Sequence, residues 1–147
     1  MSTLDLRGRL GHLTENEDKA LADFKALIST KDGYYDPERH DDHIILRFLR
    51  ARKFNLEQTD KMWSDYIEWF KSFKVDDICE NFEFPEYPIV KKHYPRFYHQ
   101  TDKLGRPLYI ELLGSVDVKQ LFQVTTTERM LQNHVYEYEK SWIYWRR

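Results

Sequence analysis

The sequence lacks a pair of cysteines, a long apolar run and a secretory signal segment. Cys79 is the single cysteine among 147 residues, which excludes an internal disulfide and a cysteine-based metal cluster. No stretch approaches the roughly 18 continuous apolar residues of a membrane span, so any membrane contact is expected at the surface. The first thirteen residues contain Asp5, Arg7 and Arg9 where a signal peptide would be apolar. We therefore expect a soluble, cytosolic protein.

The sequence also lacks a strong net charge and any recognisable catalytic motif. Its net charge of −2 provides no overall basic field, and we expect no nucleic-acid partner. Neither a G-x-S-x-G motif nor a phosphate-binding glycine loop occurs, and Cys79 has no obvious neighbouring base. Residues 40–43 (HDDH) have no matching third element for a metal, so their aspartates are better interpreted as helix caps. We expect no enzyme activity, no metal and no cofactor.

Aromatic residues are abundant by contrast. Phe, Trp and Tyr make up 16% of the chain, and ten of these residues are tyrosines. Such side chains combine large apolar faces with polar tips, as is typical of interfaces and of pockets for amphiphiles. Composition alone favours the simpler interpretation, an aromatic core.

Helical periodicity dominates the first half of the chain. A capping box formed by Thr14 and Glu17 predicts the start of a first helix. A second helix is predicted over 42–53, and a third over 56–73 after Asn55 as its cap. The three helices predict a small bundle with these core residues: Leu21, Phe24, Phe48, Leu49, Trp63, Ile67 and Phe70.

A connector and a hairpin are predicted next. Pro88 can begin a short helix that runs through Lys92, because the N–H groups of a first turn have no acceptor within the helix and the N–H that proline lacks is not needed there. The period then changes to two over 96–100 and 107–112, which predicts two strands. Gly105 in the intervening turn permits a positive φ, so the pattern predicts a β-hairpin.

The last predicted helix begins at a second capping box, Thr125-x-x-Glu128. It has no glycine or proline to end it before Arg147, and a lone hairpin is marginal in water. We therefore expect the chain to be the first part of a larger α/β domain, with Trp142 and Trp145 left partly uncovered. The helix carries this apolar stripe: Leu131, His134, Val135, Tyr138, Trp142 and Trp145.

Two stretches resemble the CRAL-TRIO lipid-binding family. They are 46–55 (LRFLRARKFN) and 94–109 (YPRFYHQTDKLGRPLY). Their order and separation, with 126–131 (TTERML) after them, are similar to the phosphatidylinositol/phosphatidylcholine transfer branch. The resemblance implies an α+β fold, mainly helical as present. In it, a CRAL-TRIO helical bundle over 1–75 precedes a connector and the incomplete start of the α/β lipid-binding domain over 76–147.

The resemblance also suggests where a phospholipid headgroup binds. Tyr98, Tyr109 and Tyr138 match positions that line the choline-binding region of this branch, where tyrosine faces attract a quaternary ammonium. Without the resemblance, these residues would be interpreted as core tyrosines with hydroxyls reaching solvent or a carbonyl group. These three tyrosines favour phosphatidylcholine over a neutral isoprenoid such as a retinoid or tocopherol, because a neutral ligand has no cation for them to bind.

Basic residues near the second helix form a second candidate site. Arg52 and Lys53 match residues that lie toward the inositol phosphate region, and Arg47 is a further candidate for lipid binding. On the residues alone, such a cluster is more often a solvated face. Asp102 matches the acidic partner of this segment, either as an ion pair that fixes the two lobes or as a lipid contact.

The resemblance implies a function without bond breaking. We expect phosphatidylinositol and phosphatidylcholine to be exchanged between membranes, with transient contact to a membrane surface. The expected location is cytoplasmic and peripheral, at the Golgi or other endomembranes. The alternatives are a protein-interaction module of a signalling or trafficking protein, and a CRAL-TRIO binder of another small hydrophobic ligand.

Overall fold

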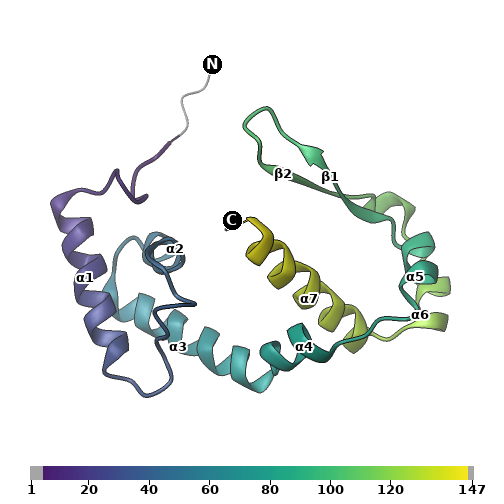
Figure 1. Cartoon of the computed structure of the whole chain (residues 1–147), viewed down its shortest axis with the longest axis horizontal. Helices are drawn as coiled ribbons and strands as arrows, with labels where there is room; N and C mark the ends of the chain where they lie inside the picture. Colours follow the sequence, from purple (N-terminus) through teal and green to yellow (C-terminus); the bar gives the residue numbers. More distant parts are fainter. Residues whose placement is uncertain (1–4, 146–147) are drawn as a thin grey trace. The chain divides into compact units, whose positions relative to one another are not determined.

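A computed structural model describes residues 5–145, with side chains described through Ser141. The chain divides into two compact units, Met1–Phe73 and Lys74–Arg147. Figure 1 shows helices in both units and a hairpin in the second. The predicted fold class, α+β and mainly helical, is confirmed.

The first unit contains α1 (Glu15–Ser29), α2 (Asp42–Ala51) and α3 (Leu56–Ser72). Each helix begins at the cap that the sequence predicts. Thr14 and Glu17 form the reciprocal capping box of α1, with 2.9 Å between Thr14 N and Glu17 Oε2. Asp41 caps α2, and Asn55 caps α3 by accepting a hydrogen bond from the Gln58 amide at 2.9 Å. The interpretation of the aspartate pair as helix-capping is therefore supported at Asp41.

Trp63 is the centre of the first unit's core. It is fully buried, and its ring contacts Phe24 and Phe48 edge-on at centroid distances of 6.0 and 4.9 Å. Phe48 is only partly buried against the cluster, whereas Phe70 is buried and packs on Tyr66. Burial is thus confirmed for six of the seven predicted core residues, and Phe48 is the exception. The buried cluster of this unit is Leu21, Phe24, Ile28, Ile45, Leu46, Leu49, Trp63 and Ile67.

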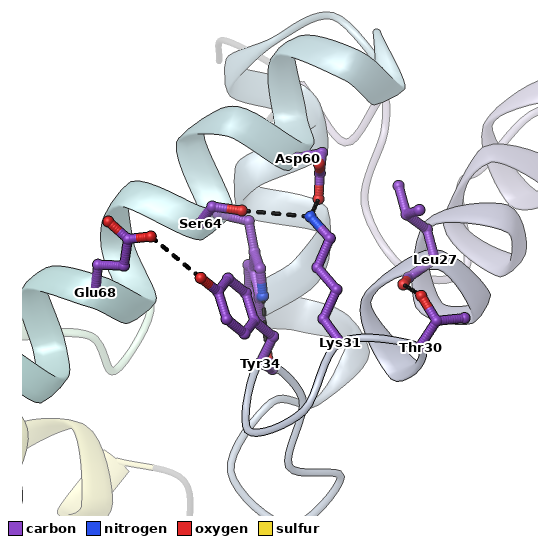
Figure 2. Close-up of polar contacts among 8 residues, drawn as sticks. Leu27, Thr30, Lys31, Tyr34, Asp60, Ser64 and Glu68 are labelled. Atoms are coloured by element: carbon purple, nitrogen blue, oxygen red, sulfur yellow. Dashed lines mark hydrogen bonds and ion pairs between the residues drawn. The ribbon is translucent and has the colours of Figure 1, made fainter.

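The loop between α1 and α2 is held on α3 by polar contacts, which Figure 2 shows. Lys31 forms an ion pair with Asp60, and the Tyr34 hydroxyl donates to Glu68 Oε1 at 3.1 Å. The Trp63 indole N–H donates to the Tyr34 carbonyl oxygen at 2.9 Å. The loop therefore supplies the hydrogen bond that a buried tryptophan requires.

The second unit contains an antiparallel hairpin. Arg96 lies opposite Glu111 and Tyr98 opposite Tyr109, while Gly105 in the turn has a φ of 76°, as predicted. Its elements are α4 (Val75–Asn81), α5 (Tyr87–His93), β1 (Arg96–Thr101), β2 (Pro107–Glu111), the 3-10 helix η1 (Leu113–Ser115), α6 (Val118–Val124) and α7 (Thr127–Trp145).

The predicted start of the last helix was wrong. Thr125 ends α6, since its amide donates to the Leu121 carbonyl oxygen, and its hydroxyl donates to Glu86 at 3.3 Å. Thr126 takes the capping role, because its hydroxyl accepts a hydrogen bond from the Arg129 amide at 3.3 Å. Helix α7 begins one residue later.

Helix α7 buries a different face from the predicted apolar stripe. Asn133 is 4% exposed, whereas Leu131 and Tyr138 of the stripe are 51% and 44% exposed. The side chains of Trp142 and Trp145 lie outside the described residues. Within this unit, Leu131, His134 and Tyr138 of the stripe are therefore exposed, whereas Val135 is partly buried.

Candidate functional site

Tyr98 and Tyr109 form an exposed aromatic pair on the hairpin. They lie directly opposite in the strand register, so their side chains share one face of the sheet. The ring centroids are 5.0 Å apart with the planes tilted by 50°, and the residues are 46% and 38% exposed. Two electron-rich faces at this separation can attract a cation such as a quaternary ammonium.

A carboxylate holds the second of these tyrosines. The Tyr109 hydroxyl donates to Glu111 Oε1 at 3.0 Å, and the Tyr94 hydroxyl donates to the same oxygen at 3.2 Å. Burial and then the hydrogen bond to Glu111 raise the pKa of Tyr109, so its hydroxyl stays protonated. Glu111 was not among the site residues predicted from the sequence, although its position two residues after Tyr109 places both on one face of the strand.

A buried ion pair joins the hairpin to the last helix. Arg96 is only 4% exposed, and its Nη2 lies 3.3 Å from Oε2 of Glu137 on α7. The guanidinium also lies over the Tyr94 ring, 5.1 Å from the centroid. Among the described residues, Arg96 Nε has no hydrogen-bond acceptor, so part of the desolvation cost of burying this charge is not compensated. This pair was not predicted from the sequence, because Glu137 lies outside the two family-like stretches and Arg96, although within 94–109, had no role assigned to it.

Tyr138 is the third predicted tyrosine. It lies on α7 immediately after Glu137 and is 44% exposed. An exposed ring is compatible with ligand contact, and its role beside the hairpin pair stays a prediction.

The basic candidates lie on and after α2. Arg47, Arg52 and Lys53 are all exposed, and Arg52 Nη1 donates to the Ala51 carbonyl oxygen at 3.1 Å. Lys53 and Phe54 both have left-handed backbone conformations, with φ values of 51° and 62°. This conformation costs roughly 1–2 kcal/mol for each non-glycine residue. Strained backbone at an exposed basic turn is compatible with a functional role, and phosphate contact here stays a prediction.

Asp102 organises the hairpin turn. Its carboxylate accepts hydrogen bonds from the Leu104 and Arg106 amides at 2.8 and 2.9 Å, and it pairs with the Arg106 guanidinium at 2.6 Å. The Arg106 side chain, followed by its amide, lowers the pKa of Asp102. The carboxylate is thus already well satisfied locally, and its predicted pairing with the basic segment of the first unit stays a prediction.

Residues 5–145 also bear on metal binding and membrane insertion. Within this range, no group of three or more His, Cys, Asp or Glu side chains could hold a metal ion. No helix in the same range is long and apolar enough to cross a membrane. Cys79 lies on α4, is partly exposed and forms no disulfide.

Comparison with known proteins gives a consistent picture. The family model described as "CRAL/TRIO, N-terminal domain" matches residues 20–65. The Sec14 cytosolic factor of Schizosaccharomyces pombe is 52% identical over 132 residues, which cover 90% of this chain and 45% of that protein. The SEC14 cytosolic factor of Kluyveromyces lactis is 48% identical over 134 residues, with 91% and 44% covered.

A plant relative is equally similar over a shorter stretch. The phosphatidylinositol/phosphatidylcholine transfer protein SFH7 of Arabidopsis thaliana is 54% identical over 105 residues, which cover 71% of this chain and 19% of that protein. The chain therefore spans less than half the length of these relatives.

Proposed function

Because this chain belongs to the CRAL-TRIO family, in its phosphatidylinositol/phosphatidylcholine transfer branch, we propose that it binds these phospholipids and exchanges them between membranes. The Tyr98–Tyr109 pair is the observation that supports this proposal best. Its two open rings suit a choline ammonium, and its supporting carboxylate fixes the orientation of one ring.

The hairpin offers different chemistry on its two faces. Phe97 and Leu108 lie next to the tyrosines in the strands and therefore point to the opposite face, where they are 37% and 40% exposed. In the proposal, this apolar face contributes to the slot for acyl chains, while the tyrosine face receives the headgroup. Arg52 and Lys53 act on the phosphate of phosphatidylinositol through charge-assisted hydrogen bonds.

The proposed cycle breaks no covalent bond. One phospholipid leaves a bilayer, is shielded from water by the protein and is released at another bilayer. We propose that this contact with membranes is transient and occurs from the cytosol, at the Golgi or other endomembranes. The names of the yeast relatives, cytosolic factors, are in keeping with this location.

A chimera provides the test. This chain replaces the matching 132 residues of the Schizosaccharomyces pombe relative, and transfer of labelled phosphatidylinositol and phosphatidylcholine between vesicles is measured. We expect the chimera to transfer both lipids and to release them chemically unchanged. A chimera that folds like the relative but transfers neither lipid would refute the proposal. Mass spectrometry of extracted ligands checks for the alternative, a different small hydrophobic molecule.

A further inference from the structure

Glu111 connects the exposed tyrosine pair to the interior of the second unit. It ends β2 and lies opposite Arg96, the first residue of β1. One oxygen, Oε1, accepts the hydroxyl protons of both Tyr94 and Tyr109. Two donated protons suit an ionised carboxylate, which can only accept hydrogen bonds.

The charges around Tyr109 leave an excess of negative charge. Two carboxylates, those of Glu111 and Glu137, act on its hydroxyl together with one guanidinium, that of Arg96. The guanidinium pairs with Glu137, at 3.3 Å. Among the described contacts, Glu111 is therefore satisfied by tyrosine hydroxyls, and its negative charge is left without a paired cation.

We propose that Glu111 determines headgroup specificity, because its carboxylate makes the Tyr98–Tyr109 pair attractive to a quaternary ammonium and unfavourable to an anionic headgroup. This inference rests on the proposed function, since it concerns the same tyrosine pair. The rings attract a cation at short range through their faces. The carboxylate adds a charge–charge attraction at the hydroxyl end of Tyr109, which solvent screens in part because both rings are exposed.

Glu111 also positions the pair. Its hydrogen bond fixes the hydroxyl end of Tyr109, and the 5.0 Å contact with Tyr98 then sets the distance between the rings. The two roles are separable, because glutamine in place of Glu111 keeps an oxygen acceptor and removes only the charge.

The test measures binding of choline to the unaltered protein and to the E111Q variant by NMR, using the ring signals of Tyr98 and Tyr109. The matched control is E83Q, which removes an exposed carboxylate of the same unit. We expect E111Q to weaken choline binding about five- to tenfold, as for one partly screened charge, and E83Q to leave it unchanged. Phosphate should bind E111Q at least as well as it binds the unaltered protein.

A second measurement needs no variant and so remains decisive if E111Q fails to fold. The neutral isostere 3,3-dimethylbutanol has the shape of choline without its charge, and we expect it to bind the unaltered protein several-fold more weakly than choline. Equal binding of the two molecules, no shift of either tyrosine ring, or equal choline binding by folded E111Q would overturn the inference. Failure of the chimera to transfer lipid, with choline binding still dependent on Glu111, would instead refute the proposed function alone.

Discussion

Replacement of Trp63 by alanine is the most direct test of how the first unit is held together. The side chain is fully buried, and its ring is packed by Phe24, Phe48 and Tyr66. Removing a buried tryptophan typically lowers the free energy of unfolding by about 3–5 kcal/mol, because the cavity does not fully collapse. The Tyr34 carbonyl oxygen also loses its indole donor, which adds about 1 kcal/mol.

The same helix provides the control. Trp69 lies six residues later on α3 and is 45% exposed, so its replacement by alanine should cost less than about 1 kcal/mol. Replacement of Trp63 by phenylalanine should give an intermediate loss, since a ring remains but the indole donor is gone. Hydrogen exchange of amides in α1, α2 and α3, measured across a urea series, reports on this unit separately from the other. Equal losses for the two alanine variants would refute the assignment of Trp63 as the core.

Three further predictions follow from the site and the surface. In the chimera, replacement of Tyr98 by alanine should weaken phosphatidylcholine loading by about 0.5–2 kcal/mol, and joint replacement of Arg52 and Lys53 by glutamine should instead lower phosphatidylinositol loading. Equal effects of both variants on both lipids, with lower melting temperatures, would indicate structural roles. The pKa of Asp102 is lower in the folded protein than in the unfolded chain, where it is roughly 3.9. The Asp102 carboxylate therefore stabilises the hairpin fully above this unfolded-state pKa, and the stabilisation is lost as the pH falls through the folded-state pKa. NMR of the turn amides should therefore change only below about pH 4, and the D102N variant should lack this transition. Phe122 is 51% exposed on α6, so the protein should bind a hydrophobic dye, and less dye should bind after replacement of Phe122 by serine.

Local chemistry explains why much of the fold could be predicted from the sequence. The caps at Thr14 and Asn55 depend on residues within one helical turn, and both were predicted correctly. Thr125 and Thr126 could each cap α7. The spacing of Thr125 and Glu128 favours Thr125, whereas Thr126 is the cap in the structure. Contact of Thr125 with Glu86, 39 positions earlier, decides between them, and a local pattern contains no such information.

Short helices and buried charges were harder to predict. Helices α4 and α6 have seven residues each, too few for a clear apolar period, and the connector containing α4 was predicted without this helix. In the candidate site, Tyr98 and Tyr109 were predicted from the family resemblance, and their direct pairing across the strands was found only in the structure. The ion pair between Arg96 and Glu137 could not be predicted, because it depends on how α7 packs against the hairpin.

Cys79 gives this two-unit molecule a natural site for spectroscopy. As the single cysteine of the chain and a partly exposed thiol, it can be labelled with one fluorescent acceptor dye without the introduction of another cysteine. Trp63 and Trp69 belong to the first unit and Cys79 to the second, so the two tryptophans can act as donors across the boundary. With Trp142 and Trp145 replaced by phenylalanine, energy transfer to the dye would report the distance between the units, and its change on adding phospholipid vesicles would reveal movement during lipid exchange.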